Sequence, residues 1–305
     1  MTTSHLSRTP STPRVLDLLC PSSTADLLSL VGEGRRVIAG GTDLLVRLAQ
    51  IPEPAPPLVV SVAGVRELGR IDVEEGQVRI GAGVTHAQVA ENDDLRRLVP
   101  ALTDASEMVG SIQIRMTATV AGNVCNASPS ADTVPALAVH GSIVEVAASG
   151  GARRSVPIAE FSTGPGGTVL TRGEAVVGLT VDPLGPREGS AYRRFTVRNS
   201  MDLAFAGVAV RIAVGPDRVA VRSAKIALGA VGPTVVVADK AAEILRGWEG
   251  DTDQLMASGR VAAEESLPIS DLRASADFRL QLVRVLVADC VREAVRRARS
   301  QHLRP

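Results

Sequence analysis

Two stretches of the sequence combine glycine with short polar side chains, a combination that suits an oxyanion. The first is "VIAGGTDLL", residues 37 to 45. Gly40 and Gly41 have no Cβ atoms, so the turn can bring backbone N–H groups together around a group such as a pyrophosphate. Thr42 and Asp43 can add side-chain hydrogen bonds or cap a following helix. An ordinary strand-to-helix turn has the same composition, and the glycine pair alone leaves both interpretations open.

The second stretch is "TATVAGNVCNASPSAD", residues 117 to 132. We expect a loop in which Gly122 again permits close approach of a ligand. Thr119, Asn123 and Ser128 offer donors and acceptors, and Asp132 offers an acceptor for a sugar hydroxyl or a ring N–H. A tight connector rich in Asn and Ser is the alternative. The two stretches together favour a ligand with phosphate and sugar groups.

Other chemistry has weaker support. "GAGVTH", residues 81 to 86, begins like a dinucleotide-binding fingerprint, but its sixth position is His86 instead of glycine. We expect His86 in a loop or at the surface, and Cys125 as a small buried apolar residue. The histidines (His5, His86, His140, His302) and the cysteines (Cys20, Cys125, Cys290) are too scattered to form a metal site or a disulfide framework. No catalytic acid, base or metal ligand is predicted.

Composition excludes several classes of protein. The 305 residues include 33 basic and 33 acidic side chains, so no net charge attracts nucleic acid, and at 2% aromatic residues are too few for base stacking. No run approaches eighteen apolar residues, and the start of the chain carries no secretory signal. We expect a polar disordered tail over residues 1–12, no membrane insertion and a cytoplasmic location.

The elements that must position these residues follow from local patterns. Residues 22–34 predict a capped helix, residues 37–38 a strand before the glycine turn, and residues 43–50 a helix. After the Pro-rich connector 51–57, residues 58–65 and 77–89 predict strands, and residues 90–110 predict helix. Without a strict alternation of strand and helix, the fold class is α+β.

A cluster of Pro and Gly within residues 180–195 predicts a domain boundary. Beyond it, residues 202–214 are an apolar segment and residues 218–232 an alternating one, and residues 277–298 predict a long helix. In this helix every fourth residue is apolar, which predicts one buried stripe: Phe278, Leu282, Leu286, Cys290 and Ala294. The arginines of the opposite side are expected to form a solvated face: Arg292, Arg296, Arg297 and Arg299.

Six segments in order carry a resemblance that no single motif could carry: "AGGTDLL", "IGAGVTH", "IQIRMTATVAGNVCNASPSAD", "GPGGTVLTRGE", "YRRFTVRNSMDLA" and "SADFRLQLVRVLV". Together they resemble the flavin (medium) subunit of the molybdenum hydroxylases, the family of carbon monoxide dehydrogenase and xanthine dehydrogenase, over residues 13–298. The resemblance implies FAD as cofactor. It also implies a two-lobed FAD-binding domain of the vanillyl-alcohol oxidase (PCMH) type over residues 13–185. A CO dehydrogenase flavoprotein-like α+β domain would follow over residues 186–305, with a three-stranded antiparallel sheet and a helical bundle.

The resemblance also implies which residues contact the cofactor. Those along the adenosine diphosphate half are Arg36, Val37, Ile38, Ala39, Gly40, Gly41, Thr42, Asp43 and Leu44. Those on the other side of the diphosphate and the ribityl chain are Thr119, Gly122, Asn123, Ser128 and Asp132, with further contacts from Val109 and Gly110. Those near the isoalloxazine are Glu174, Ala175 and Val176, with Tyr192 and Arg194 at its open face.

One position departs from the family pattern. The usual loop reads Thr-Ile-Gly-Gly-Asn, whereas this chain has Ala121 before Gly122. The extra methyl group would weaken FAD binding if it points at the cofactor and would be harmless if it points away.

By the same resemblance the chain would transfer electrons and leave substrate oxidation to others. It would receive electrons from the [2Fe-2S] clusters of a small subunit, in a complex whose large subunit binds molybdopterin, and pass them through FAD to NAD, oxygen or a quinone. Two alternatives stay open. The chain could be a stand-alone FAD-dependent oxidoreductase, or a scaffold subunit whose flavin site has degenerated.

Overall fold

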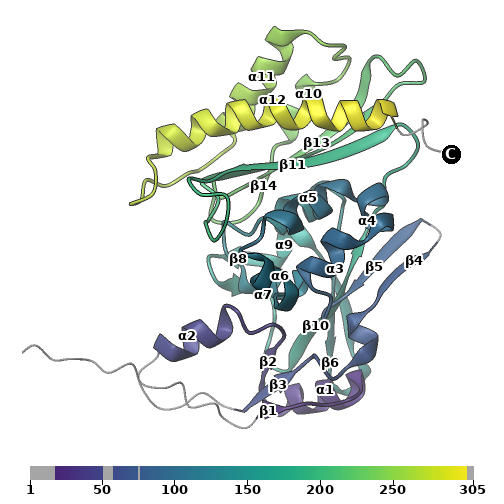
Figure 1. Cartoon of the computed structure of the whole chain (residues 1–305), viewed down its shortest axis with the longest axis vertical. Coiled ribbons are helices and arrows are strands. Elements are labelled where there is room, and N and C mark those ends of the chain that lie inside the picture. Colours follow the sequence, from purple (N-terminus) through teal and green to yellow (C-terminus); the bar gives the residue numbers. More distant parts are fainter. Residues whose placement is uncertain (1–17, 51–57, 75, 301–305) are drawn as a thin grey trace, which may run out of the picture.

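The computed structural model describes residues 18–50, 58–74 and 76–300. The predicted tail over residues 1–12 and the connector 51–57 lie outside the described residues. Figure 1 shows two α+β parts that follow each other along the chain, with the second part stacked on the helices of the first. The α+β class is therefore confirmed. Within the described part of the chain, no helix is both long and apolar enough to cross a membrane.

A small parallel sheet opens the first part. Its strands, in the order β1-β3-β2, are β1 (Leu18–Leu19), β3 (Val59–Ser61) and β2 (Arg36–Ile38). The predicted first helix is α1 (Thr24–Gly32), whose N-cap Ser23 accepts a hydrogen bond from the Asp26 amide. Its apolar residues are buried against this sheet and its neighbour. The glycine turn leads from β2 directly into α2 (Leu44–Gln50).

A five-stranded antiparallel sheet follows, in the order β4-β5-β10-β6-β7. Its strands are β4 (Ile71–Glu74), β5 (Gln77–Gly81), β10 (Glu174–Val181), β6 (Ile143–Ala148) and β7 (Arg153–Pro157). The strand predicted over residues 77–89 ends at Gly81 instead. The reason is a capping box, in which Thr85 and Gln88 satisfy each other's backbone amides and start helix α3 (His86–Glu91).

Helices cover this sheet. They are α3, α4 (Asp93–Leu98), α5 (Pro100–Met108), α6 (Ile112–Thr117), α7 (Val120–Asn126), α8 (Thr133–Val139) and α9 (Ile158–Phe161). The helix predicted over residues 90–110 is broken into the end of α3, α4 and α5, because Asn92 caps α4 and Pro100 begins α5. The second glycine stretch is not a loop throughout. Thr119 caps it through the Gly122 amide, and residues 120–126 form α7.

The second part is a sheet packed between helices from both parts of the chain. The order β11-β12-β13-β14 comprises β11 (Glu188–Phe195), β12 (Ala206–Val214), β13 (Val221–Gly229) and β14 (Val236–Val237). The two-residue β14 adds to the three strands predicted. Helices α10 (Asp239–Ile244), α11 (Thr252–Glu264) and α12 (Ala276–Ser300) lie on one side of this sheet and α5 lies on the other (Figure 1). Helix α8 packs on β12 and β13 as well.

The stripe predicted on α12 is wrong at its start. Phe278 is 42% exposed, whereas Cys290 and Ala294 are fully buried. Four residues turn a helix by more than one full turn, so a strict fourth-residue pattern drifts by about 40° per step. The residues that stay buried follow the i, i+3, i+4, i+7 spacing of one helix face: Val283, Leu286, Val287, Cys290, Val291, Ala294, Val295 and Ala298.

Two arginines of α12 are not on a solvated face. Arg279 is 2% exposed and donates to the Phe205 carbonyl oxygen at 2.6 Å. Arg297, predicted to be solvated, donates to both carboxylate oxygens of Asp104 on α5, at 2.8 and 3.0 Å. The long helix therefore fastens the second part of the chain to the first.

Candidate functional site

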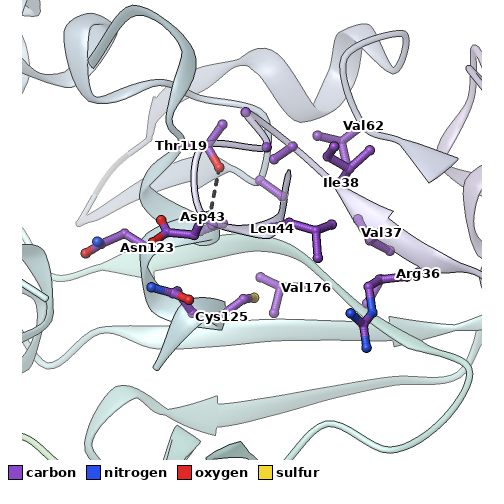
Figure 2. A pocket seen from close by; sticks show the side chains of 18 of the residues that line it. Arg36, Val37, Ile38, Asp43, Leu44, Val62, Thr119, Asn123, Cys125 and Val176 are labelled. Carbon is purple, nitrogen blue, oxygen red and sulfur yellow. Dashed lines mark hydrogen bonds between the residues drawn. The ribbon is translucent and has the colours of Figure 1, made fainter. Parts of the chain in front are cut away.

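The two glycine stretches border one cavity of about 680 Å³. The β2–α2 turn forms one wall, the segment from α6 to α7 forms another, and the start of β10 closes the site. Figure 2 shows Arg36 and Val37 at one end of the labelled set and Thr119 and Asn123 at the other. The predicted residues that line the cavity are Arg36, Val37, Ile38, Ala39, Gly40, Gly41, Thr42, Asp43, Leu44, Val109, Thr119, Ala121, Gly122, Asn123, Glu174, Ala175 and Val176.

The glycine turn has no room for side chains. A Cβ atom on Gly40 would lie 2.1 Å from the Thr117 carbonyl oxygen, and Gly41 has a φ of +70° that favours glycine. Within the described part of the chain, the amides of residues 40–43 donate to no protein acceptor. Backbone donors without protein partners, on a turn with no bulk, suit the oxygens of a phosphate ester.

The opposite wall is held in place by side-chain hydrogen bonds. Thr133 Oγ1 donates to Asn123 Oδ1 at 2.7 Å, which orients the Asn123 side chain and leaves its NH2 group to serve the cavity. Arg47 of α2 donates to Asn126 Oδ1 of α7 at 2.5 Å, so a direct bond joins the helices that follow the two glycine stretches.

Ala121 does not extend the wall with a free methyl group. It is 3% exposed and belongs to the core cluster that includes Val120 and Val124. This packing argues against a flavin site that has degenerated through Ala121.

Four arginines line the cavity: Arg35, Arg36, Arg47 and Arg172. Only Arg36 was predicted from the sequence. A Cβ atom on Gly34 would lie 2.6 Å from Arg172 Nη2, so the guanidinium of Arg172, in the turn before β10, lies over the residues before β2. Arginine suits phosphate because its planar donors can pair with two oxygens at once. The missed signal was basic residues flanking glycine at residues 34–36 and 172–173.

Glu174 lines the cavity but is already paired. Arg154 donates to its two oxygens at 2.6 and 2.7 Å, and the Thr171 amide adds a third bond at 2.7 Å. The Arg154 hydrogen bond is the main reason that the pKa of Glu174 is lowered to about 2. Glu174 therefore stays ionised and holds the start of β10 in position.

Five predicted contacts are not among the residues that line the cavity: Gly110, Ser128, Asp132, Tyr192 and Arg194. The buried Asp132 carboxylate accepts a hydrogen bond from the Tyr192 hydroxyl at 2.7 Å and pairs with Arg194. Tyr192 is 1% exposed, so it borders no open face. The structure therefore uses Asp132, Tyr192 and Arg194 to join the two parts of the chain.

Two further residues of the cavity differ from the sequence prediction. His86 is neither in a loop nor at the surface, because it begins α3 and is fully buried. Desolvation, with a smaller effect of Arg115, lowers the pKa of His86 to about 4. Cys125 is half-buried, and desolvation raises the pKa of its thiol to about 12, so the sulfur stays protonated at neutral pH.

Comparisons with known proteins agree with this geometry. Residues 14–182 match the family described as "FAD binding domain in molybdopterin dehydrogenase", and residues 190–294 match "CO dehydrogenase flavoprotein C-terminal domain". The chain is 30% identical to the xanthine dehydrogenase FAD-binding subunit of Escherichia coli O157:H7, over 90% of this chain and 94% of that protein. It is 28% identical to the carbon monoxide dehydrogenase medium chain of Afipia carboxidovorans, over 94% of this chain and 99% of that one.

A solved structure shows the same fold. Quinoline 2-oxidoreductase from Pseudomonas putida 86 contains a chain that is 27% identical, with a TM-score of 0.86 over 93% of this chain and 98% of that chain. The family matches cover more than half of the chain, and they include both the cavity and the sheet that packs above it. The chain therefore belongs to the molybdenum hydroxylase family, as one of its FAD-binding medium subunits.

Proposed function

We propose that this chain is the electron-transfer subunit of a molybdopterin, [2Fe-2S] and FAD hydroxylase, and that the described cavity holds the FAD. One observation carries the proposal. Two glycine stretches about eighty residues apart in sequence border a single cavity, with amides that have no partner among the described residues and four arginines around it. That donor set matches a dinucleotide that has an anionic centre and two uncharged ends.

The residues of the chain would bind and orient the cofactor. The amides of residues 40–43, with Arg35, Arg36 and Arg172, would hold the diphosphate, while Asn123 would hold a ribityl or phosphate oxygen. The apolar residues Val109, Ile114 and Val176 would exclude water from the ring system. Bound FAD would supply the electron transfer itself.

We further propose two domains with separate duties. Residues 13–185 would bind FAD, and residues 186–305 would cover the helices of that domain. The buried contacts of Asp132 with Tyr192 and Arg194 support this division, because they lock the second domain onto the first without entering the cavity.

The chain would act with a molybdopterin-binding large subunit and a [2Fe-2S] small subunit, and would deliver electrons to NAD, oxygen or a quinone. Support comes from its full-length match to a protein named the medium chain of carbon monoxide dehydrogenase. We expect the native complex to contain all three chains and to lie in the cytoplasm.

Absorbance of the purified chain tests the cofactor. We expect a yellow protein with an absorbance band at about 450 nm, or an apoprotein that acquires this band when FAD is added. A chain that stays colourless in excess FAD would contradict the proposal. Affinity purification from the native host tests the partners, since a chain that elutes alone and oxidises a donor by itself would favour the stand-alone oxidoreductase.

A further inference from the structure

Three of the four phenylalanines of this chain lie together at one end of the second sheet. The Phe195 ring packs edge-on against the rings of Phe205 and Phe278, with centroids 5.9 and 5.8 Å apart. Phe195 is nevertheless 36% exposed and Phe278 42% exposed, in a chain with only 2% aromatic residues. Because aromatic side chains are enriched where proteins bind one another, this end of the sheet is the first part of a candidate interface.

The loop that follows Phe195 continues the apolar surface. Within residues 196–205, the side chains of Val197, Met201 and Leu203 are 73%, 56% and 52% exposed. Met201 has a φ of +53°, a conformation that is unfavourable for residues other than glycine and asparagine. The chain therefore holds a methionine at the surface where a smaller residue would fit the backbone better. Figure 1 shows this loop at the end of the sheet beside which α12 begins.

The same loop contacts the first domain next to α6. The Met201 amide and Ser200 Oγ both donate to the Gly110 carbonyl oxygen at 3.1 Å. Gly110 lies just before α6, in which Ile112 and Met116 are 68% and 61% exposed. These apolar side chains from both domains form what we call the apolar patch: Ile112, Met116, Phe195, Val197, Met201, Leu203 and Phe278. An exposed apolar surface of this kind is typical of a protein interaction site.

The apolar patch lies close to the cavity. Ile114 of α6 lines the cavity, whereas Ile112 and Met116 of the same six-residue helix are exposed. Each residue of α6 is at least partly exposed, so little protein separates the cavity from the patch. A partner on the patch would be separated from the cavity by about the width of one helix, roughly 10 Å.

Charge on the apolar patch favours an anionic partner. Residues 110–117 and 195–201 include Arg115 and Arg198 but no acidic residue. Asp202, the next carboxylate, accepts hydrogen bonds from three backbone amides of its own loop at 3.0 to 3.1 Å and lies 3.8 Å from Arg198. The patch therefore has a net positive charge. An iron-sulfur cluster held by four cysteine thiolates is anionic, and complementary charge favours the correct encounter of two proteins.

We propose that the apolar patch is the docking surface for the [2Fe-2S] small subunit. The inference rests on the proposed function, because it assumes a complex in which that subunit delivers electrons to this cavity. Among the proposed partner chains, the cluster chain is the one that must lie beside the cavity. The patch meets that requirement and spans both domains, so docking would also depend on their correct assembly.

The variant Met201→Asn tests the docking surface. Asparagine adopts a positive φ more easily than methionine, so we expect unchanged or higher thermal stability and an unchanged flavin absorbance band. Affinity for the [2Fe-2S] chain isolated from the wild-type complex should fall by about tenfold, a usual loss when a central apolar contact is removed. Ile112→Gln, on the other segment of the patch, should cause a similar loss.

Val73→Asn is the matched control. Val73 is 45% exposed on β4, which Figure 1 shows on the opposite side of the molecule, so affinity for the cluster chain should stay the same. A retained flavin band shows that each variant has folded.

Wild-type affinity in both Met201→Asn and Ile112→Gln would overturn the assignment. So would loss of the large subunit, or of self-association of this chain, with binding of the cluster chain intact, because the patch would then have another occupant. If the wild-type chain binds no FAD, or if no cluster chain elutes with it, it is the proposed function that fails.

Discussion

At the scale of single residues, the shape of the cavity depends on the absence of a Cβ atom at Gly40. The turn between β2 and α2 lies against the backbone of residues 117 and 118, so the two walls touch at the point where a side chain would begin. This contact explains the glycine without any appeal to flexibility. It also means that the shape of the site can be tested with one added methyl group.

Gly40→Ala should prevent normal FAD binding. The new Cβ atom would sit 2.1 Å from the Thr117 carbonyl oxygen, so the two walls must separate. We expect a loss of at least about tenfold in FAD affinity, equal to roughly 1.4 kcal/mol, measured by flavin titration. Gly69→Ala is the control, because a Cβ atom there meets nothing within 4 Å. Equal affinities in the two variants would contradict this account of the turn.

Glu174→Gln should change how stability depends on pH. A carboxylate whose pKa is lowered from 4.5 to about 2 stabilises the fold fully above pH 4.5, and that contribution is lost as the pH falls toward 2. The wild type should therefore be more stable than the variant at pH 7, and the difference should shrink between pH 4.5 and 2. Thermal melting across this range measures it. A difference that is the same at pH 7 and near pH 2 would exclude the Arg154 pair as its source.

At the scale of elements, α7 is the helix that shapes the second wall. Its seven residues include Gly122 and Asn123, which are poor helix formers, so its start depends on the Thr119 cap. The polar residues that suggested a loop are in fact the N-cap and the first residues of a short helix. Composition could not distinguish a loop from a capped helix start, because Ser, Thr and Asn are common in loops and at N-caps alike.

Thr119→Ala should loosen α7 and weaken FAD binding together. Loss of the bond from the Gly122 amide to Thr119 Oγ1 should cost about 1 kcal/mol of stability. Thr119→Ser should retain most of both properties. Asp251→Ala is the control, since it removes the cap of α11, where the Gln254 amide is the donor, in a helix that does not line the cavity. It should lower stability by a similar amount with no effect on flavin titration.

At the scale of the whole molecule, the second domain is joined to the first by buried and partly buried charges. The Asp104 carboxylate of α5 accepts hydrogen bonds from both terminal nitrogens of Arg297 and from the amide of Tyr192. A second pair joins Asp132, which directly precedes α8, to Arg194 of β11. Such pairs need good geometry to compensate for desolvation, and their main effect here is to set the position of the sheet on α5 and α8.

Arg297→Ala should therefore destabilise the junction of the two domains. It leaves Asp104 without its bidentate partner, and we expect a loss of roughly 2 to 3 kcal/mol in the free energy of unfolding. Calorimetry should show a lower melting temperature, or two transitions in place of one. Arg292→Ala, which breaks an exposed 3.5 Å pair with Asp289, should cost less than about 1 kcal/mol. Equal losses would show that Arg297 is only a surface residue.

The sequence by itself determined the local features of this protein. The Ser23 cap, the Gly40 and Gly41 turn, the strands of the second domain and the ordered segments that mark the family all depend on neighbouring residues. Their physics is short-ranged, since caps, turns and side-chain periodicity act within a few residues. For the same reason, the two glycine stretches and the class of ligand that they suit could be recognised from the sequence alone.

Only the tertiary structure decided which side chains belong to the cavity. It brought Arg172 over Gly34 and buried His86 with no partner among the residues that the structure describes, while it turned Asp132 toward Tyr192 and away from the site. Each of these outcomes depends on a contact between distant residues, as in the pair of Asp104 and Arg297, which lie 193 positions apart. Burial and hydrogen-bond pairing are properties of the packed chain, so local sequence patterns do not predict them.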